Sequence, residues 1–189
     1  MSSFLLTAPA VEPLLLAEAK AFLRIETNDD DNVVTALIAG ARTHVETQTR
    51  RALITQSWRL SFDFWPANGR LSIVPAPLRV LAAARVYDAS NVAQTVDTAA
   101  FVLDKGASAL IVAPWGVPAP GRAQAGIELD VTVGYGDAAA DVPEPLRQAI
   151  RLLVAHWYEN RGLVTTGVDY STLPQSIAAL IAPYRVLSL

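Results

Sequence analysis

The sequence predicts an α+β fold, with a helical core of about four helices and an inserted small antiparallel β-sandwich or barrel module. Apolar residues recur at helical spacing towards both ends of the chain, whereas the middle alternates apolar and polar residues as strands do. The chain has 189 residues, 52% of them hydrophobic and 17% charged, which is enough to fill the core of one domain carrying an insertion.

Two helices are expected first, at about 13–25 and 30–51. In the second, the apolar residues at helical spacing that should be buried are Val34, Leu37, Ile38, Ala41 and Val45. The charged residues Arg42, Glu46 and Arg50 follow one another at i, i+4 spacing on another face, where they can form ion pairs.

The period changes to two from residue 53 to residue 64, which predicts a strand that Pro66 and Gly69 end. Further short strands are expected at 70–74, 80–87, 101–104, 110–112 and 127–135. Residues 53–136 are therefore expected to form the inserted β module. Residues 1–52 and 137–189 are expected to form the helical core.

A third helix is predicted at 143–162, because Pro143 or Pro145 can begin it and a glycine ends it. A short fourth helix is expected at about 174–182. The tail that follows, 183–189, is apolar for the end of a domain. It either folds back on its own core or docks onto a partner, and composition alone leaves both alternatives open.

Composition argues against several classes of function. The net charge is −3 and no run of basic residues occurs, so the electrostatic pattern of a nucleic-acid-binding protein is missing. The chain has no cysteine, which excludes disulfides, thiol nucleophiles and cysteine-based zinc sites. The longest apolar stretches are too short to cross a bilayer, and the start of the chain lacks the pattern of a signal peptide.

A search for catalytic and ligand sites finds no convincing set. His156 lies three residues before Glu159, but no second histidine at suitable spacing completes a metal site. No paired carboxylates or nucleophile–base set stands out, so we expect no enzyme, cofactor or metal. Trp65 and Trp115 lie in proline-bearing loops, where exposed aromatic residues favour a protein interface over a glycan-binding platform, which is the alternative function.

Four segments in order carry a resemblance to a known family. They are AKAFLRI (19–25), LIAGARTHVETQTRRALITQSWRLSFDFWP (37–66), VTVGYGDAAADVPEPLRQAIRLLVAHWYENRG (131–162) and LPQSIAALIAPYRV (173–186). Together they closely resemble the head–tail connector, or adaptor, family of tailed phages, in the subfamily also found in gene transfer agents. The match covers nearly all of the chain, and only the middle strands, at about 67–126, have a sequence that is not specific to the family.

The resemblance implies a dodecameric ring in the neck of a phage or gene-transfer-agent particle, assembled in the bacterial host cytoplasm. The portal protein would bind one side and a stopper or tail-completion protein the other, without catalysis, while double-stranded DNA passes through without specific binding. No membrane is involved. In isolation the chain is expected to be a monomer or a weak oligomer.

The family's portal-docking segment falls at the chain's C-terminus, which implies docking through Ile181, Tyr184, Arg185, Val186, Leu187, Ser188 and Leu189. A ring also needs two different lateral faces. Charged residues on exposed helix faces that could supply them are Arg42, Glu46, Arg50, Arg147, Arg151 and Glu159. Trp65 and Trp115 are the loop aromatics that would face the stopper.

Overall fold

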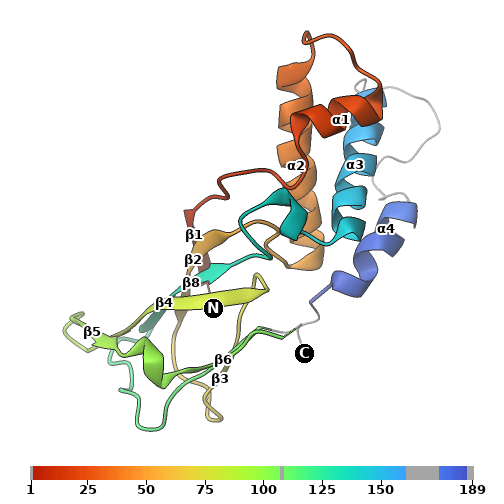
Figure 1. Ribbon diagram of the computed structural model, residues 1–189. Helices are drawn as coiled ribbons and strands as arrows, with labels where there is room; N and C mark the ends of the chain where they lie inside the picture. Colours follow the sequence, from red (N-terminus) through yellow and green to blue (C-terminus); the bar gives the residue numbers. More distant parts are fainter. Residues whose placement is uncertain (1, 107–108, 161–174, 187–189) are drawn as a thin grey trace. The chain divides into compact units, whose positions relative to one another are not determined.

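The computed structural model describes residues 2–106, 109–160 and 175–186 (Figure 1). The chain divides into two compact units. The β unit contains residues 1–10 and 55–135, and the helical unit contains residues 11–54 and 136–189. The chain therefore passes from one unit to the other at three junctions, after residues 10, 54 and 135.

In its described residues, the helical unit contains the four predicted α-helices and two short 3-10 helices. The α-helices are α1 (Leu16–Leu23), α2 (Asp31–Thr49), α3 (Glu144–Glu159) and α4 (Gln175–Ile181). The 3-10 helices are η2 (Ala139–Asp141) and η3 (Ala182–Tyr184). Pro143 is the N-cap of α3 and Pro145 lies in its first turn, as the sequence predicted.

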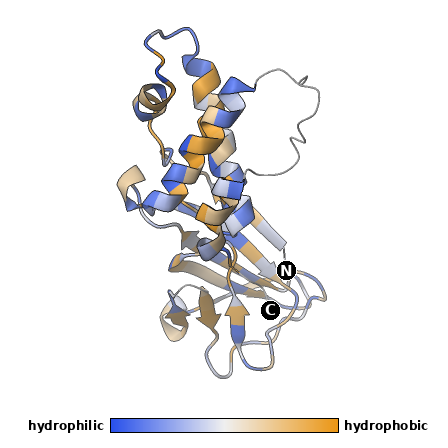
Figure 2. Ribbon diagram, turned by 90° about the vertical axis from the view of Figure 1, so that its right-hand side faces the viewer, coloured by the Kyte–Doolittle hydropathy of each residue, from blue (hydrophilic) through white to orange (hydrophobic). Residues whose placement is uncertain are grey.

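Helices α2 and α3 pack against each other through apolar stripes (Figures 1 and 2). The buried residues of α2 are Val34, Ile38, Ala41, Val45 and Thr49. Those of α3 are Leu146, Ala149, Ile150, Leu153 and Val154. Both sets recur every three or four residues, so that each helix turns one face to the core and leaves its charged residues on the other.

The described part of the β unit forms two antiparallel sheets. The five-stranded sheet has the order β1-β2-β8-β4-β5. Its strands are β1 (Ser2–Thr7), β2 (Gln56–Phe62), β8 (Ile127–Val133), β4 (Leu78–Tyr87) and β5 (Ala93–Val96). The three-stranded sheet consists of β3 (Arg70–Ser72), β7 (Leu110–Val112) and β6 (Val102–Asp104), and η1 (Thr98–Ala100) precedes β6. Helices and antiparallel sheets together confirm the predicted α+β class.

The central strand β8 shows how the larger sheet divides core from surface. Its odd-numbered residues, from Ile127 to Val133, are buried, whereas Glu128, Asp130 and Thr132 point to the other face. Residues paired across neighbouring strands share a face, so Leu60 of β2 lies with Leu129 in the core. The opposite face carries charged side chains.

Two strands were not predicted. Residues 2–7 form β1, which pairs with β2, so residues 1–10 belong to the β unit and their assignment to the helical core was wrong. Residues 93–96 form β5 against the end of β4. The sequences SSFLLT and AQTV do not alternate apolar and polar residues, because all but one of these side chains are exposed and no buried face selects a period of two.

Candidate assembly surfaces

The C-terminal segment packs on the helical unit to which it belongs. Ile177 and Ile181 of α4 are buried, and Val186 is only 8% exposed. A backbone and a side-chain hydrogen bond hold the segment: the Val186 N–H donates to the Thr49 carbonyl oxygen at 2.9 Å, and the Arg51 side chain donates from Nε to the Tyr184 carbonyl oxygen at 2.5 Å.

The predicted portal-docking residues therefore separate into groups. Ile181 and Val186 lie in the core of the helical unit, which is the first of the two alternatives that the sequence left open for the tail. Tyr184 is half-buried and Arg185 is exposed, with its guanidinium donating to Gln48 Oε1 at 2.9 Å. Leu187, Ser188 and Leu189 lie outside the described residues.

Four of the residues suggested for lateral ring contacts already form ion pairs within the chain. Arg42 binds Glu12 at 2.7 Å and Glu46 at 2.8 Å. Burial opposes the charge of Arg42, but the hydrogen bond that Arg42 donates to Glu12 and the two nearby carboxylates outweigh it, so the arginine pKa is raised. The Glu46 carboxylate also accepts from the Leu53 N–H, which ties the end of α2 to the chain that follows.

A second charged group joins α1 to α3. Arg147 binds Glu18 at 2.9 Å and Glu144 at 3.0 Å, and Arg151 also hydrogen-bonds Glu144. The Arg151 hydrogen bond is the main cause of a lowered Glu144 pKa. Of the remaining two suggested residues, Arg50 caps the C-terminus of α2 in a left-handed backbone conformation and Glu159 ends α3, and both are exposed.

The two loop tryptophans have different environments. Trp65 is half-buried: its indole N–H donates to the Pro118 carbonyl oxygen at 2.9 Å, and its ring lies 6.1 Å from that of Phe101. Trp115 is fully exposed. Because Trp65 packs within its own unit, the glycan-binding alternative loses one of the two rings on which it depended.

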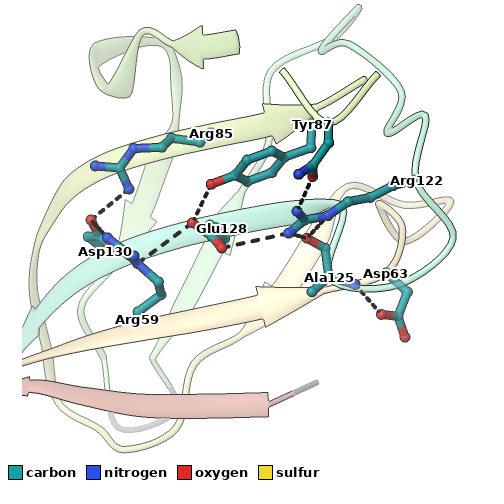
Figure 3. Close-up of polar contacts among 9 residues, drawn as sticks. Arg59, Asp63, Arg85, Tyr87, Arg122, Ala125, Glu128 and Asp130 are labelled. Atoms are coloured by element: carbon teal, nitrogen blue, oxygen red, sulfur yellow. Dashed lines mark hydrogen bonds and ion pairs between the residues drawn. The ribbon is translucent and has the colours of Figure 1, made fainter. Parts of the chain in front are cut away.

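A charged network that the sequence did not predict lies on the solvent face of the five-stranded sheet (Figure 3). Asp130 on the central strand accepts hydrogen bonds from Arg59 of β2 at 2.7 and 3.0 Å and from Arg85 of β4 at 2.7 Å. Beside it, Glu128 accepts a hydrogen bond from the Tyr87 hydroxyl at 2.9 Å.

The network changes the proton affinities of its members. The hydrogen bonds from Arg59 are the main cause of a lowered Asp130 pKa, and the same bonds raise the pKa of Arg59. The hydrogen bond to Glu128 raises the pKa of Tyr87, whose ring also stacks against the Arg122 guanidinium at 3.8 Å. The charges are paired within one face, which suits a rigid sheet surface better than a reactive site.

The described residues contain no group of three His, Cys, Asp or Glu side chains placed to hold a metal ion. His44 meets the ring of Trp157 edge-on at 6.0 Å, which places one of the two histidines in a packing role. None of the described helices is long and apolar enough to cross a membrane.

Comparison with known proteins identifies the family. A comparison with curated protein sequences finds no significant match. Solved structures do match over the whole chain. The neck of an empty gene-transfer-agent (GTA) particle, computed with C6 symmetry, contains a chain 27% identical with a TM-score of 0.84, and the match covers 100% of this chain and 97% of that one.

Two related structures agree: the virion of a native GTA particle at 26% identity and a TM-score of 0.82, and the neck of a native GTA particle with C12 symmetry at 26% and 0.79. Each match covers 100% of this chain and 97% of the other. The model of the phage gp6-like head–tail connector proteins matches residues 14–74 and 121–185, which is well over half of the chain. The chain therefore belongs to the phage gp6-like head–tail connector family and is a structural connector, not an enzyme.

Proposed function

We propose that this connector is a subunit of a closed ring in the neck of a phage or gene-transfer-agent particle. There it joins the portal to a stopper or tail-completion protein and surrounds the channel through which DNA leaves. The observation that carries the proposal is the full-length structural match to chains of GTA necks solved with C6 and C12 symmetry. The C12 neck supports a dodecamer for this chain.

The charge of the chain suits a channel that DNA passes through. Protein–DNA affinity comes largely from Lys and Arg side chains that neutralise phosphates and release counterions. Here the net charge is −3, and the charged network on the five-stranded sheet pairs its arginines with Asp130 and Glu128. A ring of such subunits would let double-stranded DNA pass without holding it.

The C-terminal segment, residues 181–189, is proposed to dock onto the portal. Because Ile181 and Val186 are buried in the helical unit, Arg185 and the exposed part of Tyr184 are the described side chains best placed for the first contact. Arg50 and Glu159, which are exposed, are the proposed lateral contacts, and the exposed Trp115 is proposed to face the stopper.

A deletion of residues 184–189 tests the docking. In the producing cell we expect heads that fill with DNA but do not join tails, because the ring cannot attach to the portal. The deletion also removes the buried Val186 side chain, so a control must lower stability without shortening the chain.

Ile177→Ala is a suitable control, since Ile177 is 1% exposed in α4 and lies outside the proposed docking segment. Particles of the Ile177→Ala variant should still carry tails. If the deletion variant folds, as judged by circular dichroism, and its particles join tails normally, the docking proposal is wrong.

A further inference from the structure

Strand β1 is an unprotected edge of the five-stranded sheet. It pairs with β2 on one side, and no strand of the described chain pairs with its other side. All six of its residues are exposed, with Phe4 at 67%. Proteins usually protect such an edge with charged residues or proline, because its free N–H and C=O groups can pair with another strand. The sequence SSFLLT contains neither.

The other edge of the same sheet is β5, whose residues are also largely exposed. Four antiparallel pairings separate β1 from β5, so the two strands run in the same direction. A second copy of the sheet placed beside the first in the same orientation would therefore bring β1 of one copy next to β5 of the other, in parallel.

We propose that β1 of each subunit pairs in parallel with β5 of its neighbour, so that the sheet continues from one subunit to the next. This inference rests on the proposed ring. A closed ring needs two different surfaces on each subunit that bind one another, whereas a surface that binds itself gives a two-fold dimer and stops. The two edges of one sheet meet that requirement.

The lengths and side chains of the two strands fit. The register of β1 on β2 is regular from Ser2 to Leu5 and shifts before Thr7, which leaves four regular residues to match the four of β5. Full overlap in parallel places Ser2 beside Ala93 and Phe4 beside Thr95.

These residues also lie on one face. Phe4 is paired with Arg59, and Thr95 is paired with Arg85, and both arginines bind Asp130 on the solvent face of the sheet. The small side chains of Ala93 and Thr95 leave room for the exposed Phe4 ring. Pairing would cover this ring and satisfy backbone groups of both edges.

Cross-linking in particles tests the pairing. Because the chain contains no cysteine, a maleimide can link its subunits only through the cysteines that are introduced. The variant Ser2→Cys with Ala93→Cys is treated with a short bismaleimide and run on a denaturing gel. We expect a ladder of this chain extending beyond the dimer. Either cysteine alone should give no covalent oligomer, because equivalent residues of neighbouring subunits lie a whole sheet apart.

A second pair of variants distinguishes the effect of a charge on the edge strand from that of a charge elsewhere on the same face of the sheet. Phe4→Lys, made in the double-cysteine background, places a charge on the edge and should weaken the ladder several-fold. Val80→Lys is the control: Val80 is 50% exposed and is paired with Thr132 on the same face, but it lies on an interior strand. It should leave the ladder unchanged.

Three results would overturn the pairing: dimers from Ser2→Cys alone, no ladder from the double variant in particles that contain the chain, or equal loss from both lysine variants. Absence of the chain from purified particles is a different result. It would contradict the proposed neck function itself, so the two failures can be told apart.

Discussion

Val186 offers a measurement of how firmly the C-terminal segment packs on the helical unit. Its side chain is 8% exposed, and its N–H bonds the Thr49 carbonyl oxygen. Val186→Ala removes two buried methyl groups and keeps the backbone hydrogen bond. At about 0.8 kcal/mol per buried methylene-sized group, the loss is about 1.5 kcal/mol. The cavity adds to it and relaxation near the chain end reduces it, so we expect about 1–2 kcal/mol.

Urea denaturation of the purified chain, followed by far-UV circular dichroism, measures this loss in the free energy of unfolding. Arg185→Ala is the control, because its side chain is exposed and hydrogen-bonds the exposed side of α2 at Gln48, and it should cost less than about 0.5 kcal/mol. If Val186→Ala costs no more than Arg185→Ala, the segment does not pack on the helical unit in solution. The account of a buried docking segment would then be refuted.

Four further substitutions test the packing and the charged network. Asp130→Asn should destabilise the chain near neutral pH, because the carboxylate binds Arg59 and its pKa is lowered on folding. This stabilisation is present above the unfolded pKa of about 3.9 and is lost as pH falls through the lower folded value, so wild type and variant should converge in acid urea titrations. Ile150→Ala, in the core of α3, should cost about 2–5 kcal/mol by the same assay at neutral pH. Trp65→Ala should lower the free energy of unfolding by more than about 1 kcal/mol, because its hydrogen bond and packing are lost, whereas Trp115→Ala should change it by no more than about 0.5 kcal/mol. Thermal denaturation compares the two, and a larger loss from Trp115→Ala would contradict the prediction.

The helices could be predicted because their sequence patterns are local. The stripe of α2 and the proline start of α3 depend on residues within a few turns of one another, and both elements lie within a few residues of their predicted ranges. The alternation of buried and half-exposed residues in β8 is equally local, and it placed that strand correctly.

The missing parts depend on distant partners. Residues 2–7 form strand β1 because they pair with β2, more than 50 residues further along the chain. No pattern within residues 2–7 predicts that pairing. The Asp130 network likewise joins three strands, although the alternating positions of Glu128 and Asp130 could have indicated a charged face. Composition could not decide whether Val186 is buried in its own unit or against a partner, because an apolar side chain leaves water equally well in either position.

The most direct test of the central claim is cryo-electron microscopy of the neck of assembled particles from the producing cell. The account predicts a ring of twelve copies of this chain between the portal and the tail, with DNA or an open channel on its axis. A neck whose density contains no copy of the chain, or particles in which the chain lies elsewhere, would contradict it.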